Sequence, residues 1–286
     1  MNDADFALFA TLLKDRSGLI ITPDKLYLLE TRLGPLMRHH GLAGLGALAS
    51  LIRMTWPEPL IAEIVDAMTT NETSFFRDHG PFEKFTQTIL PALIKARAGQ
   101  KRLRLWSAAC STGQEPYSLA MLLNEQAAAL AGWRIDIVAT DISDRVLERA
   151  RTGIYSTFEV QRGMPVRLLM KYFEQTGSDW RLRPDVTGMV DFRKCNLLGE
   201  LRGLGQFDLV FCRNVLIYFD AGTKRKVLGA IRGQMASDGY LMLGGAESMY
   251  GISDDFIDVA GLRGVYRRAP IDANFQSAPS RRTATS

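Results

Sequence analysis

From about residue 102 the sequence alternates between short apolar runs and longer amphipathic stretches. The runs RLRLWSAA, RIDIVATD, FDLVFCR and YLMLGGA have the length and apolar content of buried strands. Helical stretches separate them: PYSLAMLLNEQAAALAG, expected to end at Gly132; DRVLERAR, which Ser143 can cap and Gly153 can end; and TKRKVLGAIRGQMA. Strands that alternate with helices predict an α/β fold built on a parallel, doubly wound sheet.

The first 70 residues have helical periodicity only. Phe6, Phe9 and Leu13 recur at helical spacing, and Thr22-Pro23 is typical of a helix start. A later apolar stripe consists of Leu60, Ile61, Ile64, Val65 and Met68. We therefore predict a small helical domain over residues 1–70. A further helix is expected from the spacing of Phe82, Phe85, Ile89 and Leu93.

The alternation is interrupted between residues 154 and 192. A helical stretch, PVRLLMKYF, is followed by WRLRPDV and MVDFRKC, which we interpret as short antiparallel strands with a turn at TGSD. We expect this segment to be a small β-subdomain inserted into a domain spanning residues 81–270. The small, polar and basic residues 271–286 are expected to form a disordered tail.

Composition excludes several classes of protein. The longest apolar runs are far shorter than the roughly 20 residues of a membrane span, so no membrane insertion is expected. The N-terminus MNDADFALFA lacks a basic region typical of a secretory signal, which favours the cytoplasm. Cys110, Cys195 and Cys212 have no CxxC spacing, so neither a metal site nor a disulfide framework is predicted. The formal charge of +4 permits an acidic partner without requiring nucleic acid.

In a sheet of this kind, ligands bind beyond the carboxyl ends of the strands. The first strand is followed by SAACSTGQEPYS, whose small residues allow close approach of a ligand, and the second ends at Asp141, which can accept both hydroxyls of a ribose. The dinucleotide fingerprint GxGxxG is absent. An ordinary tight turn and a helix-capping aspartate remain alternatives, but together the two features favour an adenosine-containing ligand.

The segment TTNETSFFRD, residues 69–78, gathers small polar side chains before a pair of phenylalanines and an arginine. Its polar residues either cap a helix or line a site. In order and spacing, TTNETSFFRD, SAACSTGQEPYSLA, ATDIS with RARTGIY, CNLL and FCRNVLIYFD resemble the CheR-type chemotaxis receptor methyltransferases, over nearly the whole chain to about Arg268. That family transfers a methyl group from S-adenosylmethionine to receptor glutamates, leaving S-adenosylhomocysteine. The resemblance implies an N-terminal helical domain and a Rossmann-like methyltransferase domain with an inserted antiparallel β-subdomain.

The resemblance also implies the cofactor site. Residues 71–80 become an interdomain linker that carries cofactor contacts, Asp141 holds the ribose, and Asn196 and Leu197 flank the adenine. The implied cofactor-binding residues are Asn71, Thr73, Arg77, Glu115, Asp141, Asn196, Leu197, Arg213 and Asn214.

We expect Arg77 and Tyr218 to lie beside the transferred methyl group. A glutamate carboxylate, with a pKa of about 4.3, is ionised at neutral pH and needs no general base, so these residues would orient the acceptor. The alternatives are an aromatic packing role for Tyr218 and an ion pair of Arg77 with Asp78 or Asp220. Since no histidine accompanies Cys110 or Cys212, we expect small buried residues and not thiol nucleophiles.

The resemblance further implies a docking surface for the cytoplasmic methylation helices of chemoreceptors. Lys25 and Arg32, seven residues apart on one expected helical face, and Arg38, after the expected bend at Gly34-Pro35, match basic residues that face the receptor. Some members also capture a receptor C-terminal pentapeptide on the inserted sheet. The short TGSD turn argues against that here, and nothing indicates more than a monomer.

Two other functions stay open. A nitrogen methyltransferase acting on nucleic acid or protein would use the same fold, but such enzymes often carry an Asp/Asn-Pro-Pro-aromatic turn where this chain has RNVLIYF. A non-catalytic sensor would bind the cofactor or its product, with less need for Arg77 and Tyr218.

Overall fold

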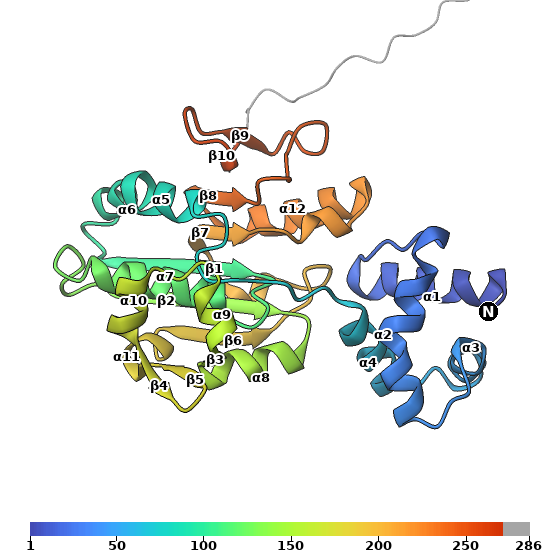
Figure 1. Ribbon diagram of the computed structural model, residues 1–286. Coiled ribbons are helices and arrows are strands. Elements are labelled where there is room, and N and C mark those ends of the chain that lie inside the picture. Colours follow the sequence, from blue (N-terminus) through green and yellow to red (C-terminus); the bar gives the residue numbers. More distant parts are fainter. Residues whose placement is uncertain (271–286) are drawn as a thin grey trace, which may run out of the picture.

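The computed structural model describes residues 1–270; the tail expected to be disordered, residues 271–286, lies outside the described residues. Four helices and a 3-10 turn form the N-terminal part (Figure 1): α1 (Asp3–Ser17), η1 (Pro23–Lys25), α2 (Leu26–His39), α3 (Leu45–Thr55) and α4 (Glu58–Met68). Asn2 and Asp5 form a capping box at the start of α1, and Gly18 ends it in the left-handed conformation. The apolar faces of these helices form a core of their own, which includes Phe9, Leu29 and Ile64.

The second part contains the sheet and the helices that cover it. Its elements before the small subdomain are α5 (Gly80–Lys84), the π-helical turn η2 (Phe85–Ile89), α6 (Leu90–Ala96), β1 (Arg102–Ala108), α7 (Gln114–Glu125), β2 (Arg134–Asp141) and α8 (Asp144–Thr152). The elements after it are β6 (Val190–Lys194), η3 (Arg202–Leu204), β7 (Phe207–Cys212), η4 (Leu216–Tyr218), α12 (Ala221–Gly233), β8 (Met235–Leu243), β9 (Phe256–Asp258) and β10 (Val265–Arg268). Ser143 caps α8 and Gly153 ends it, as predicted.

The main sheet has the order β6-β2-β1-β7-β8-β10-β9. Pairing is parallel from β6 to β8, and β10 pairs antiparallel with both β8 and β9. This confirms the Rossmann-like sheet; the antiparallel edge was not predicted, because its two strands are only three and four residues long. No helix within residues 1–270 has the length and apolar character needed to cross a membrane.

The inserted subdomain contains β3 (Ile154–Ser156), α9 (Thr157–Gln161), α10 (Val166–Tyr172), β4 (Phe173–Thr176), β5 (Asp179–Leu182) and α11 (Pro184–Thr187). Its antiparallel sheet has the order β3-β5-β4, and the expected turn at TGSD joins β4 to β5. The assignment of MVDFRKC to this sheet was wrong. Residues Val190–Lys194 form β6, which pairs parallel with β2 at the edge of the main sheet, where Phe192 packs into the domain core.

Helix α7 is shorter than predicted. It ends at Glu125, and turns replace the expected helix as far as Gly132. Seven further helical residues would advance the chain by about 10 Å. The turns instead bury Leu130 and bring Arg134 to the start of β2, where its N–H donates to the Lys101 carbonyl (2.9 Å).

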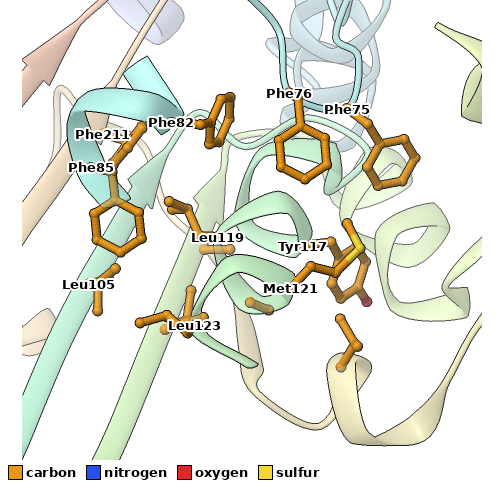
Figure 2. Close-up of a cluster of buried hydrophobic side chains, with 14 of the residues drawn as sticks. Phe75, Phe76, Phe82, Phe85, Leu105, Tyr117, Leu119, Met121, Leu123 and Phe211 are labelled. Carbon is orange, nitrogen blue, oxygen red and sulfur yellow. The ribbon is translucent and has the colours of Figure 1, made fainter. Parts of the chain in front are cut away.

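Alternate residues of the central strands face two separate cores. Leu103 and Leu105 face the core formed with α5 to α8 and the subdomain, and Trp106 faces the core formed with α12. Phe75 and Phe76, from the segment between the helical part and α5, point into the first core beside α7 (Figure 2), and both are at most 4% exposed. Their burial fixes the segment against the sheet domain, since a buried phenylalanine contributes roughly 2–3 kcal/mol.

Candidate functional site: a cavity between the helical part and the strand ends

A cavity lies at the carboxyl ends of β1, β2 and β7. Its walls also include the segment between α4 and α5, the loop after β6, and the loop after α1. All ten residues predicted for the cofactor or for catalysis line it: Asn71, Thr73, Arg77, Glu115, Asp141, Asn196, Leu197, Arg213, Asn214 and Tyr218. The structure thus brings together residues that are up to 147 positions apart in the chain, from Asn71 to Tyr218.

Asp141 ends β2 and is 5% exposed. Its two carboxylate oxygens each accept one backbone bond, Oδ2 from the Ser111 N–H (2.8 Å) and Oδ1 from the Ser143 N–H (3.0 Å). Burial nevertheless raises the pKa of this carboxyl above its ordinary value, because desolvation outweighs these bonds. Since each carboxylate oxygen has two acceptor positions, one remains on each oxygen for a ligand.

The loop after β1 has an unusual backbone. Ala109 and Ser111 adopt left-handed conformations (φ 55° and 51°), as does Gly113 (φ 93°). A Cβ atom at Gly113 would lie 3.0 Å from the Cβ of Ala150 and 3.1 Å from the Tyr155 hydroxyl, so only glycine fits there. Left-handed non-glycine residues cost free energy and cluster at functional sites. This loop leads directly into the N-terminus of α7, where backbone N–H groups favour negative charge.

A buried arginine connects three walls of the cavity. The Arg213 side chain is 1% exposed; its Nη1 donates to Glu115 Oε2 (2.9 Å), and its Nη2 donates to Asp78 Oδ2 and to the Arg77 carbonyl (both 2.8 Å). The second oxygen of Glu115 accepts from the Ser107 hydroxyl (2.8 Å). Arg213 was predicted to contact the cofactor. Both terminal nitrogens donate to protein acceptors, so Arg213 holds Glu115 and the linker in place, and its contact with the cofactor stays a prediction.

Arg77 is half-buried and donates to the Glu72 carbonyl (2.9 Å). The ion pairs weighed as alternatives are not formed, because Asp78 pairs with Arg213 and Asp220 pairs with Lys14 (2.9 Å). The polar segment before Arg77 does not cap α5 either, whose N-cap is His79. Instead, the Ser111 hydroxyl donates to the Asn71 carbonyl (2.8 Å), so this segment is bound to the loop after β1.

Asn196 and Leu197 lie in the loop after β6. The Asn196 amide donates to the Arg16 carbonyl at the end of α1 (2.7 Å), and Oδ1 accepts from the Leu198 N–H (3.0 Å). Leu197 is buried and supplies an apolar wall together with Ile142. Cys110 and Cys212 are buried as predicted, and burial raises the pKa of both thiols.

Ser17 and Leu19 of the helical part also line the cavity and were not predicted. Ser17 is the last residue of α1, and the loop that carries Leu19 is attached to the sheet domain through the Ile20 N–H, which donates to the Tyr218 carbonyl (3.1 Å). A second contact between the two parts is the ion pair of Arg145 in α8 with Asp66 in α4 (2.9 Å). No sequence pattern indicates these residues, because their position depends on how the two parts pack.

Glu247, in the loop after β8, is a third residue that sequence reasoning missed. It is 9% exposed and accepts hydrogen bonds from the backbone N–H groups of Asn214, Val215, Leu216 and Gly244 at 2.7–3.0 Å. An acidic residue just beyond a strand end, in GGAES, is the available signal.

The three basic residues predicted to dock a receptor differ in their surroundings. Lys25 and Arg38 are exposed, with Lys25 in η1 just before α2. The Arg32 guanidinium donates to the Met68 carbonyl (2.5 Å) and the Thr70 hydroxyl (3.0 Å), so it supports the segment that lines the cavity. Helix α2 continues through Pro35 to His39.

Comparison with known proteins identifies both parts of the chain. Residues 4–69 match the family described as "CheR methyltransferase, all-alpha domain", and residues 71–265 match "CheR methyltransferase, SAM binding domain".

Relatives match along nearly their whole length. "Chemotaxis protein methyltransferase 1" of Pseudomonas aeruginosa is 44% identical over 271 residues, covering 93% of this chain and 98% of that protein. "Chemotaxis protein methyltransferase Cher2" of Pseudomonas putida is 40% identical over 269 residues, with 93% and 98% covered. "Chemotaxis protein methyltransferase" of Vibrio parahaemolyticus is 37% identical over 259 residues, with 90% and 93% covered. The chain therefore belongs to the CheR methyltransferase family, with S-adenosylmethionine as its cofactor.

Proposed function

We propose that this protein transfers a methyl group from S-adenosylmethionine to glutamate side chains of chemoreceptors in the cytoplasm. The resulting glutamate methyl esters would tune chemosensory adaptation. The observation that carries the proposal is the gathering of Asp141, Arg77 and Tyr218 in one cavity of a CheR-family chain. The related chemotaxis protein methyltransferases support the same pathway.

The residues of the cavity fit the cofactor. Asp141 is a buried carboxylate with one acceptor position left on each oxygen, which suits the two ribose hydroxyls. Leu197 and Ile142 supply apolar surface for the adenine, and Asn71 and Thr73 border the same cavity from the linker. Arg213 and Glu115 are proposed to act as a pair, with Arg213 orienting the Glu115 carboxylate toward the amino-acid portion of the cofactor.

The bound cofactor supplies a methyl group on a positively charged sulfur. A receptor glutamate is ionised at neutral pH, with a reference pKa of about 4.3, so the chain needs no general base. The work left to the protein is to exclude water and to hold the carboxylate in line. Arg77 donates one hydrogen bond to the Glu72 carbonyl. We assign its remaining N–H groups, together with the Tyr218 hydroxyl, to orienting the receptor carboxylate.

Docking is proposed to depend mainly on Lys25 and Arg38, which are exposed on the helical part, whereas Arg32 contributes through the linker. The cytoplasmic methylation helices of receptors are acidic in this family, so the attraction should weaken with salt. The β4–β5 turn consists of Gly177 and Ser178 only, and we retain the prediction that no receptor pentapeptide is needed.

The proposed reaction is tested by transfer of labelled methyl from S-adenosylmethionine to receptor-containing membranes, followed by mild base. Release of the label as methanol is expected, because a carboxyl methyl ester is hydrolysed and an N-methyl group is not. Base-stable label would instead support nitrogen methylation. Tight cofactor binding with no transfer to any receptor would support the sensor.

Replacing Asp141 with asparagine should weaken binding of S-adenosylhomocysteine at least tenfold, since the amide offers one acceptor oxygen in place of two. In the wild-type protein, the affinity for S-adenosylhomocysteine should be full above the pKa of Asp141 and should fall as the pH drops through that pKa. Because burial raises this pKa, the loss should begin at a higher pH than for an ordinary aspartate, whose pKa is 3.8. Calorimetry across pH measures both effects. Asp136→Asn, at the opposite end of β2, is the matched control; equal losses in the two variants would remove Asp141 from the site.

Replacing Arg77 with alanine should lower the rate of transfer about 100-fold or more, because the acceptor loses its orienting donor. Folding should be preserved, since the side chain makes one bond to a backbone carbonyl. Arg162→Ala is the control, because Arg162 pairs with Glu72 of the same segment but does not line the cavity. Near-normal turnover in folded Arg77→Ala would exclude Arg77 from the mechanism.

The double change Lys25→Glu and Arg38→Glu should raise the KM for receptor several-fold at low salt and leave cofactor affinity unchanged. Arg32→Glu is measured separately, because it also removes the bonds to Met68 and Thr70. Steady-state kinetics at two ionic strengths test the proposal. If the double variant has an unchanged KM for receptor at both ionic strengths, this surface has no docking role.

A further inference from the structure

We propose that Glu247 is a positioning residue for methyl transfer. Its carboxylate fixes the backbone after β7, so that Asn214 and Tyr218 face the cavity before cofactor and acceptor bind. The inference rests on the proposed function, because it assigns Glu247 a role in that reaction. Glu247 itself does not line the cavity and acts through the segment Asn214–Tyr218.

The hydrogen bonds of Glu247 use its whole acceptor capacity. Oε2 accepts from the N–H groups of Asn214 (2.8 Å) and Gly244 (2.7 Å). Oε1 accepts from those of Val215 (3.0 Å) and Leu216 (2.8 Å). Two oxygens with two acceptor positions each are thereby filled by four backbone donors. Hydrogen bonds to a charged group are stronger than neutral ones, so the arrangement is rigid.

The position requires a carboxylate of this length. Glutamine has one acceptor oxygen, and its NH2 group would face two N–H donors in place of the second oxygen. Aspartate is shorter by one methylene and cannot reach all four donors. Space is equally restricted, because a Cβ atom at Gly244 would lie 2.7 Å from Glu247 Oε2 and 3.0 Å from the Asn214 nitrogen.

The segment that Glu247 holds needs such support. Asn214 has a left-handed backbone (φ 58°), and the three consecutive N–H groups of residues 214–216 follow the end of β7, where no strand partner is available to them. The bond to Leu216 is buried and those to Asn214 and Val215 are partly buried, so without an acceptor these N–H groups would favour another conformation of this turn. Tyr218 lies two residues after the last of these donors. A displacement of about 1 Å in a reacting group can lower a rate about 100-fold.

The experiment compares Glu247→Gln and Glu247→Asp with Asp208→Asn. Asp208 is a suitable control because it is also a buried acid (8% exposed), accepts from Arg97 Nε (2.7 Å) and the Arg104 N–H (2.8 Å), and lies at the opposite end of β7. Thermal unfolding and the kcat for receptor methylation are measured for each variant, at a temperature where the variant is folded. The substitutions at Glu247 and the substitution at Asp208 should all lower the unfolding temperature.

A positioning role predicts that Glu247→Gln lowers kcat at least tenfold in folded protein, whereas Asp208→Asn stays within twofold of the wild type. The kcat of Glu247→Asp should lie between those of Glu247→Gln and Asp208→Asn. If kcat of folded Glu247→Gln is within twofold of the wild type, the residue has only a structural role and the inference is wrong.

Hydrogen exchange of the wild-type protein tests the inference without any variant and without transfer activity. The amides of Asn214, Val215 and Leu216 should exchange as slowly as those of β7 before any ligand is added. Rapid exchange that becomes slow only with S-adenosylhomocysteine would contradict a preformed segment. Absence of ester formation by the wild type would refute the proposed function instead, and the exchange result would still decide whether Glu247 fixes the segment.

Discussion

The rest of the site depends on the hydrogen bonds that the buried guanidinium of Arg213 donates. It comes from the end of β7 and reaches Glu115 at the start of α7 and Asp78 in the linker, while its Nη2 also binds the Arg77 carbonyl. The ring of Phe82 lies 5.7 Å from it and excludes water on one side. Removing one partner of a buried, hydrogen-bonded ion pair typically costs about 3–5 kcal/mol. Strand, helix and linker are therefore fixed relative to one another before a ligand arrives.

The linker combines two kinds of attachment. Phe75 and Phe76 anchor it by apolar burial, as Figure 2 shows, and the bonds to Ser111, Ser118 and Arg213 fix its backbone. Gly163 of the inserted subdomain packs so closely that a Cβ atom there would lie 2.2 Å from the Phe75 carbonyl oxygen. The polar residues Asn71 and Thr73 are thus carried on a rigid segment, which is the condition for binding a ligand without a large loss of conformational entropy.

Much of this arrangement follows from local sequence patterns. Alternating strands and helices predicted the sheet, and the rule that ligands bind at strand ends led to Asp141 and the SAACSTG loop. The linker residues and Asn196 depended on family resemblance, because their proximity arises from packing between parts distant in sequence. For the same reason Ser17 and Leu19 were missed.

The errors have physical causes too. The alanine-rich stretch after Glu125 has high helix propensity, but the chain must turn to begin β2. Residues Val190–Lys194 have the alternation of a short antiparallel strand, and tertiary context places them parallel to β2. Glu247 has no distinguishing spacing; its importance comes from four backbone donors that converge only in the folded chain.

The central claim is that the cavity between the helical part and the strand ends holds the cofactor with its methyl group directed at Arg77 and Tyr218. A crystal structure of the protein with S-adenosylhomocysteine tests it most directly. The account predicts both ribose hydroxyls on Asp141, the adenine against Leu197, and the sulfur within reach of an acceptor held by Arg77 and Tyr218. Product bound elsewhere, or in this cavity with its sulfur turned away from both residues, would contradict the account.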